Sequence, residues 1–100
     1  MQHRVRFHPA AVEDAEGGAA WYARRSPRTA ERFLDELDRV IDVIAADPDR
    51  FPELIVGVRR ALFHRFPYYV VFRVTEGNVE VLAIAHGKRR PRFWESRVSG

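Results

Sequence analysis

One hundred residues, 46% hydrophobic and 31% charged, are typical of a globular chain and exclude a disordered one. The length predicts one domain over residues 1–100, because two cores would each bury too little apolar surface. The absence of cysteine excludes a disulfide framework and a thiolate zinc site. Neither a membrane span of roughly 20 apolar residues nor the apolar middle of a signal peptide is visible, so we expect a cytoplasmic protein with no membrane partner.

The net charge of +3 is unevenly distributed along the chain. Residues 1–9 carry two arginines and no acid, and residues 10–57 carry six arginines against eleven acids. Residues 58–100 carry nine cations against three acids, which is a local charge of +6. A basic end of this kind is expected in a protein with one face directed at an anionic partner.

The first part of the chain predicts a short strand followed by a helix. Residues 3–8 alternate between apolar and polar side chains, as a half-buried strand does. Pro9 suits the first turn of a helix, where its missing N–H costs no hydrogen bond. Apolar residues then recur at steps of three and four, at Val12, Ala15, Ala19 and Tyr22. Glu13, Asp14 and Glu16 are predicted to occupy the first turn of this helix, where its dipole favours negative charge.

A second helix is predicted to begin after Ser26, which can cap it, with Pro27 as its first residue. Its apolar residues keep the three-four spacing for four turns, and its other face is charged. It is expected to end near Asp47. The following residues 47–53, DPDRFPE, are predicted to form a loop because two prolines four residues apart disfavour regular structure.

The remainder of the chain predicts strands at residues 58–64, 68–75 and 79–85, with a hairpin turn at 76–78. The predicted fold class is therefore α+β in the order β-α-α-β-β-β, with a helical hairpin packed on one face of a small, mostly antiparallel sheet. The residues expected to be buried where the long helix crosses the sheet are Phe33, Leu37, Ile41, Val71, Leu82 and Ile84.

Two groups of polar residues are interpreted as structural. His3 and His8 are five residues apart on a short strand and so point to opposite faces, which disfavours a metal pair, and no metal site or cofactor is predicted. The acids of the second helix lie between arginines on its polar face, which is typical of a solvated surface. These acids are Asp35, Glu36, Asp38 and Asp42.

Arginines on or beside the strands are interpreted differently, because their neighbours are apolar. Four such residues within fifteen, namely Arg59, Arg60, Arg65 and Arg73, can form a surface that binds phosphate or carboxylate. The C-terminal cations continue this basic surface at Lys88, Arg89, Arg90, Arg92 and Arg97. The alternative is that each arginine pairs with an acid of the second helix.

The end of the last strand carries His86, followed by two aromatic residues among the cations. An imidazole there can transfer protons near neutral pH, or it can simply close the strand with a hydrogen bond. Phe93 and Trp94 can stack on bases. They can also fold back over the sheet, and because tryptophan buries a large area, packing is the slightly favoured interpretation.

An ordered set of short motifs resembles the RelE/ParE toxin superfamily, in the branch of plasmid-stabilisation toxins. They are RFHPAA at the start, WY, SP and RFLDELDRVI in the helices, FP with VRRALFHRFPYYVVFRV in the strands, and VLAIAHGKRRPRFWESR at the end. The resemblance covers nearly the whole chain. It implies the same element order and the toxin of a type II toxin-antitoxin module, bound by a cognate antitoxin.

The superfamily divides by target, and the resemblance leaves two activities to weigh. RelE-like members cleave mRNA on the ribosome with basic strand residues, a third-strand arginine and a C-terminal His or Tyr, whereas ParE-like members poison DNA gyrase. Arg60, Arg65 and His86 match parts of the nuclease set, but the third-strand position holds Tyr69. This favours a ParE-like toxin, although Arg73, Lys88 or Arg89 can substitute for the missing cation, so whether the protein is an mRNA endoribonuclease stays open at this point.

The resemblance and the charges together define the expected partners. The first hypothesis is inhibition of growth by binding gyrase, the second is ribosome-dependent mRNA cleavage, and the third is a non-toxic RNA-binding module. The residues expected to bind the target or a nucleic acid are Arg59, Arg73, Lys88, Arg89, Arg92, Trp94 and Arg97. The antitoxin is expected to present an acidic amphipathic segment across the helix pair and the sheet edge, as part of a hetero-oligomer.

Overall fold

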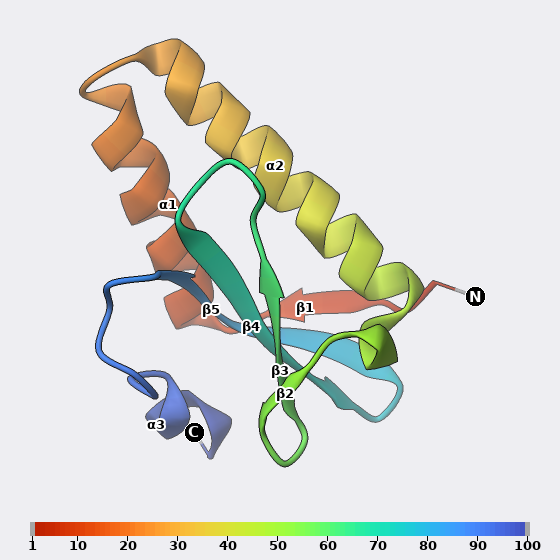
Figure 1. The fold of residues 1–100 in the computed structure, drawn as a ribbon. Helices are drawn as coiled ribbons and strands as arrows, with labels where there is room; N and C mark the ends of the chain where they lie inside the picture. The colour runs from red at the N-terminus through yellow and green to blue at the C-terminus, as the bar shows by residue number, and fades with distance from the viewer. Residues whose placement is uncertain (1, 100) are drawn as a thin grey trace.

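The computed structural model describes residues 2–99, which form a five-stranded sheet with two long helices on one face (Figure 1). In chain order the elements are β1 (Val5–Phe7), α1 (Pro9–Ala23), α2 (Pro27–Ala46), a 3-10 turn η1 (Pro48–Arg50), β2 (Glu53–Ile55), β3 (Val58–Leu62), β4 (Tyr68–Thr75), β5 (Asn78–His86) and α3 (Glu95–Val98). No described helix combines the length and the apolar character needed to span a bilayer.

Both long helices begin at caps that the local sequence supplies. The Ser26 hydroxyl accepts a hydrogen bond from the Thr29 N–H at the start of α2. At the start of α1 the same role falls to His8, whose Nδ1 accepts from the Ala10 N–H at 3.0 Å. The prediction of His8 as a strand residue is therefore wrong, because its ring turns toward the backbone of the first helical turn.

The sheet has the order β1-β5-β4-β3-β2, in which β1 is parallel to β5 and the other three pairs are antiparallel. The predicted α+β class and mostly antiparallel sheet are thus confirmed. The predicted loop at 47–53 is wrong in part, because residues 48–50 form a 3-10 turn and Glu53 begins the edge strand β2. Neither β2 nor α3 was predicted, since segments of three or four residues carry almost no periodic signal.

An irregularity in the β4–β5 hairpin determines which side chains face the helices. Val71 pairs with Ala83 but Phe72 pairs with Val81, so Leu82 is an extra residue on β5. A bulge of this kind shifts the alternation of all following side chains by one position. Val81 and Ile84 therefore face the helices, although they are three residues apart on one strand.

Two apolar clusters cover the two faces of the sheet. The cluster under the helices contains Phe33, Leu37 and Ile84, as predicted, with Ile41 half-buried at its margin. Val71 and Leu82 are also buried, but they belong to a second cluster on the opposite face. Their predicted position beneath the long helix is wrong, because the strand alternation and the bulge turn them toward the C-terminal segment.

The two adjacent glycines of α1 predict opposite effects of alanine substitution on stability. A Cβ on Gly18 would lie 2.9 Å from Phe33 Cζ, and Phe33 is completely buried, whereas a Cβ on Gly17 would meet nothing within 4 Å. Gly18→Ala should therefore lower the free energy of unfolding by about 1–3 kcal/mol through overpacking. Gly17→Ala should raise it by about 0.5–1 kcal/mol through helix propensity. Urea unfolding of the two variants checks both signs, and a stabilised Gly18→Ala would show that α1 can move away from the sheet.

Candidate functional site

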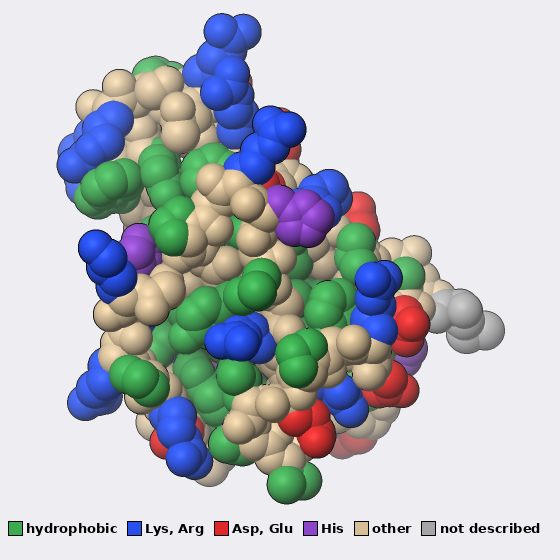
Figure 2. Space-filling view, viewed as in Figure 1, with side chains coloured by type: hydrophobic (Ala, Val, Ile, Leu, Met, Phe, Trp, Pro, Cys, Tyr) green, Lys and Arg blue, Asp and Glu red, His purple; other side chains and the backbone are tan. Residues whose placement is uncertain are grey.

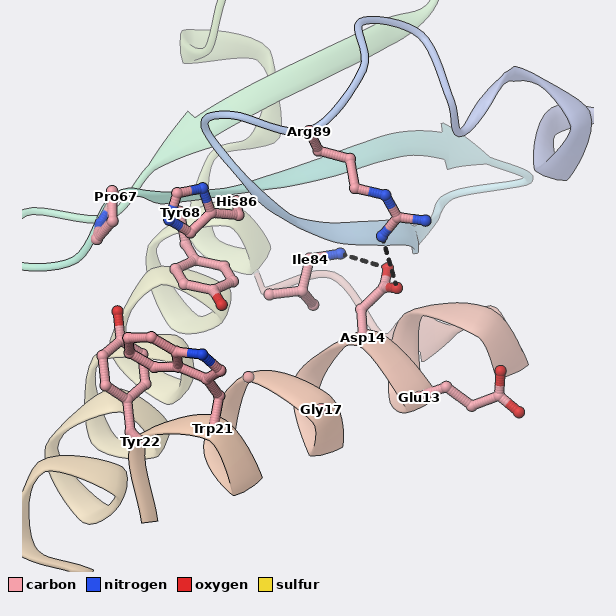
Figure 3. Close-up of a pocket in the computed structure, with 11 residues that line it drawn as sticks. Glu13, Asp14, Gly17, Trp21, Tyr22, Pro67, Tyr68, Ile84, His86 and Arg89 are labelled. Carbon is pink, nitrogen blue, oxygen red and sulfur yellow. Dashed lines mark hydrogen bonds and ion pairs between the residues drawn. The ribbon is translucent and has the colours of Figure 1, made fainter. Parts of the chain in front are cut away.

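A groove of about 660 Å³ lies between the middle of α1 and the adjacent start of β4 and end of β5. We call it the α1–β5 groove. Figure 3 shows side chains that line it. They are Glu13, Asp14, Gly17, Gly18, Trp21 and Tyr22 from α1, Pro67 and Tyr68 at the start of β4, and Ile84, His86 and Arg89 at the end of β5. Trp21 is 43% exposed, which is high for so large an apolar residue, so the groove has an accessible aromatic wall.

The bulge turns Ile84 toward the helices, and His86, two residues further along β5, lies on the same side and lines this groove. Its Nδ1 accepts a hydrogen bond from the Lys88 N–H at 3.0 Å. Its ring lies edge-on to Tyr68, with the ring centroids 5.1 Å apart. In this bond Nδ1 is the acceptor, so Nε2 is the ring nitrogen left for other partners.

Tyr68 contributes a hydroxyl to the groove, as Figure 3 shows. Burial raises the pKa of this phenol above its ordinary value of 10.0, and the neighbouring Tyr22 and Asp14 raise it further. Burial also raises the pKa of Tyr22. The Tyr68 hydroxyl is therefore neutral near pH 7, where it can donate a hydrogen bond but cannot serve as a general base.

Asp14 is the centre of the hydrogen-bonding network at the end of the groove, and it is only 9% exposed. Its carboxylate accepts from the Ile84 N–H at 3.1 Å and from Arg97 Nη1 at 2.6 Å. Arg89 approaches the other oxygen at 3.7 Å. Because β1 pairs with β5 only at residues 79–81, the edge of β5 beyond that point needs other partners. Asp14 supplies one, and Arg97 supplies another by donating to the Leu82 carbonyl at 3.0 Å.

Residues 5–91 match the family model described as the ParE toxin of the type II toxin-antitoxin system parDE. The chain belongs to the ParE toxin family. It is therefore the toxin component of a type II module, and its partner is an antitoxin. The expected RelE/ParE resemblance is confirmed and narrowed to ParE.

Similar proteins agree with this assignment over the full length of the ParE-family toxin. Proteins named toxin ParE2 from Mycobacterium tuberculosis strains CDC 1551 and H37Rv are 30% identical over 101 residues, covering 100% of this chain and 96% of theirs. A solved structure titled as the chromosomal ParDE system from P. aeruginosa has the same fold. Its TM-score is 0.75 at 18% identity, and the match covers 85% of this chain and 96% of that one.

The three residues matching a nuclease set do not lie in one site of this ParE-family toxin. His86 lines the α1–β5 groove, on the helix side of the sheet. Arg60 lines a separate pocket on the opposite face, beside Tyr69. Arg65 is exposed beside a third hollow, along α2, where its backbone N–H is bonded to Glu36. Sequence matching alone could not separate them, because it does not assign sheet faces.

Two aromatic residues at the C-terminus pack as the favoured interpretation predicted. Trp94 is 1% exposed and lies against Val71 and Leu82 in the second apolar cluster, so its packing on the sheet is confirmed. The prediction that Trp94 is a target-binding anchor is wrong for this structure, because its ring is not accessible. Phe93 is half-buried, and the Arg89 guanidinium stacks on it at 4.0 Å from the ring centroid.

Most of the predicted binding arginines have an acidic partner. The N···O distances are 2.7 Å for Arg73–Glu80 and Arg92–Glu95, and 3.9 Å for Arg59–Glu53. Arg97 is 13% exposed and bonded to Asp14, so the C-terminal segment uses it to attach to α1. Lys88 is exposed. The acids that pair with these cations come from the strands, α1 and α3, and not from α2 as the alternative proposed.

Glu36 departs from the prediction of a solvated acidic face on α2. It is 8% exposed, and its carboxylate accepts hydrogen bonds from the backbone N–H groups of His64 and Arg65. It also lies 3.5 Å from Arg39. Glu36 therefore attaches the β3–β4 loop to α2, whereas its neighbours Asp35 and Asp38 are exposed as predicted.

The sequence interpretation missed Asp14, Tyr68 and Trp21 as residues of the groove. Asp14 was assigned to the favourable dipole near the start of α1, although it lies beyond the first turn. The sequence did carry a pattern that could have indicated two of these residues, Asp14 and Trp21. Asp14, Gly18 and Trp21 recur at steps of four and three, so they share one helix face that combines an acid, the smallest residue and the largest one.

Proposed function

We propose that this ParE-family toxin inhibits growth by binding a protein target, DNA gyrase, and not by cleaving RNA. The observation that carries the proposal is the separation of Arg60, Arg65 and His86 into three pockets on two faces of the sheet. Cleavage of a phosphodiester needs its proton-transfer group and its cations within reach of one phosphate. A binding surface has no such requirement, since its contacts can be spread over a wide area.

A second observation argues against proton transfer at His86 and for a groove that binds protein. Its Nδ1 is engaged by the Lys88 backbone, and its ring packs on Tyr68. The adjacent Tyr68 hydroxyl is neutral, because burial raises its pKa. The groove thus offers an apolar and aromatic surface with a few polar groups, which is the composition of a protein-binding site.

The antitoxin is proposed to cover part of the same region. Three large apolar residues on the helical hairpin, Val12, Trp21 and Leu34, are between 42% and 43% exposed. A hydrophobic face of this kind suits an amphipathic segment, and the basic C-terminal part of the chain would attract an acidic one. Trp21 would be shared, since it belongs to both the helical hairpin and the α1–β5 groove.

Expression of the toxin without antitoxin, with DNA, RNA and protein synthesis followed separately, tests the proposed target. We expect DNA synthesis to stop first and purified toxin to inhibit gyrase. His86→Ala should remain toxic, as should His64→Ala, a matched control at an exposed histidine. A nuclease would instead lose two or more orders of magnitude of cleavage rate in His86→Ala. Ribosome-dependent mRNA cuts that vanish in this variant, with gyrase unaffected by excess toxin, would establish the RelE-like alternative.

A further inference from the structure

A second pocket, which we call the Arg60 pocket, lies on the sheet face opposite the long helices. It has a volume of about 370 Å³ and apolar walls that include Leu54, Leu62, Tyr69 and Trp94. Figure 2 shows hydrophobic and Lys/Arg side chains interspersed on the visible side of the molecule. Leu62 is 60% exposed, so an apolar wall of the pocket is open to a partner.

Unlike Arg59 and Arg73, which also lie on the sheet, Arg60 has no acidic partner in the part of the chain that the structure describes. It belongs to none of the ion pairs found among residues 2–99. Its Nε is buried and lacks any hydrogen-bond acceptor within the same part of the chain. Its guanidinium carbon lies 5.7 Å from the Tyr69 ring centroid, so the aromatic ring helps to position it. The adjacent Arg59, in contrast, donates to the Asp49 carbonyl and pairs with Glu53.

An unpaired buried donor on a cation implies a missing acceptor. A buried N–H without a partner costs about 1–3 kcal/mol, and more on a charged group. A planar guanidinium is best satisfied by a carboxylate or a phosphate, which can accept two parallel hydrogen bonds. Arg60 lines the pocket with no acid among the described residues paired to it, so an anion that enters the pocket can pair with the guanidinium.

The surroundings of Arg60 favour a carboxylate on a polypeptide over a nucleic acid. The other two arginines of the pocket, Arg89 and Arg92, have acids of the chain within 3.7 and 2.7 Å, so the pocket offers one free cation and not a row of them. Trp94 is too buried to stack on a base. Nucleic-acid surfaces combine several free cations with a row of exposed aromatic faces, whereas this pocket has, among the residues that the structure describes, one unpaired cation beside a single half-buried tyrosine, Tyr69.

We propose that the Arg60 pocket binds the side-chain carboxylate of a Glu or Asp in the antitoxin, with an apolar neighbour of that residue against Leu62. The proposal rests on the proposed function, since it assumes the antitoxin of a type II module as the partner. Its chemistry is one bidentate ion pair, shielded from water by the apolar walls. Such a contact would fix the register of the antitoxin on the sheet as well as strengthen its binding.

The test is a titration of the intact toxin with the peptide acetyl-Leu-Glu-Leu-amide, followed through the arginine Nε–Hε signals in ¹⁵N NMR. The Arg60 signal should shift more than that of any other arginine, and the Gln analogue should leave it unmoved. Arg60→Gln should lower peptide affinity at least tenfold, and Arg60→Lys should not restore it fully. Arg28→Gln, which removes the same charge from an exposed position on α2, should change affinity less than twofold.

Three results would overturn the proposal: equal shifts with the Glu and Gln peptides, an unmoved Arg60 signal, or an oligouridylate that shifts Arg60 at lower concentration than the peptide. The last would assign the pocket to nucleic acid. If Arg60→Gln does not fold, the titration of the unsubstituted toxin still decides. Because this readout involves neither growth nor gyrase, its failure is distinguishable from failure of the proposed function.

Discussion

Replacement of Trp94 by alanine should lower the free energy of unfolding by about 3–5 kcal/mol, the usual cost of emptying a buried tryptophan site. Trp94 fills the second apolar cluster beneath the C-terminal segment and is 1% exposed. Small domains are stable by only about 5–15 kcal/mol, so this variant should be partly unfolded at growth temperature. Loss of toxicity would then follow from loss of the fold, which urea unfolding monitored by circular dichroism would reveal.

Two controls distinguish loss of the fold from loss of a target contact in the Trp94→Ala variant. Phe93→Ala should cost clearly less, because its ring is only half-buried at the margin of the second apolar cluster. In a Trp21→Phe background, Trp94 is the sole tryptophan, and its fluorescence should resist quenching by iodide. A Trp94→Ala protein that melts within a degree or two of the parent but no longer binds its target would restore the view of Trp94 as an anchor.

Replacement of Asp14 by alanine should destabilise the toxin by about 3–5 kcal/mol, as removal of one partner from a buried ion pair does. The substitution leaves the largely buried Arg97 without its carboxylate, and the Ile84 N–H loses its acceptor. Asp14→Asn should cost less, because the amide oxygen can still accept from Ile84. Thermal and urea unfolding of the two variants measures this difference.

A double substitution isolates the contribution of the ion pair itself. Asp14→Ala combined with Arg97→Met should be less destabilising than the sum of the single changes, since neither charge is then left buried alone. Glu13→Ala is the matched control, because it removes an adjacent acid whose side chain is exposed and unpaired among the described residues. If Asp14→Ala unfolds like Glu13→Ala, the network does not hold the C-terminal segment.

The α1–β5 groove could be predicted from the sequence only in part, because the sequence does not show which face of the sheet its side chains occupy. The position of His86 at the end of the last strand was correct, yet the face that it occupies depends on one extra residue, Leu82, in β5. Nothing in the apolar run VLAIA marks a bulge, because every residue in it can be buried on either face. The face of the sheet on which Arg60 lies could not be predicted either. Strand alternation assigns side chains to faces only after the register with the neighbouring strands is known.

The sequence by itself determined the order of the main elements, the caps and start of α2, the apolar face of that helix and the membership in a toxin superfamily. The cap depends on a contact between residues close in the chain, Ser26 and Thr29, and the helix face depends on the spacing of apolar side chains. The superfamily is indicated by the order of short motifs along the chain. Tertiary structure alone decided the roles of Asp14 and Arg60. Asp14 and Arg97 are 83 residues apart in the chain, and the unsatisfied Nε of Arg60 results from the side chains packed around it. Such contacts form only once the sheet is assembled, so no local pattern can encode them.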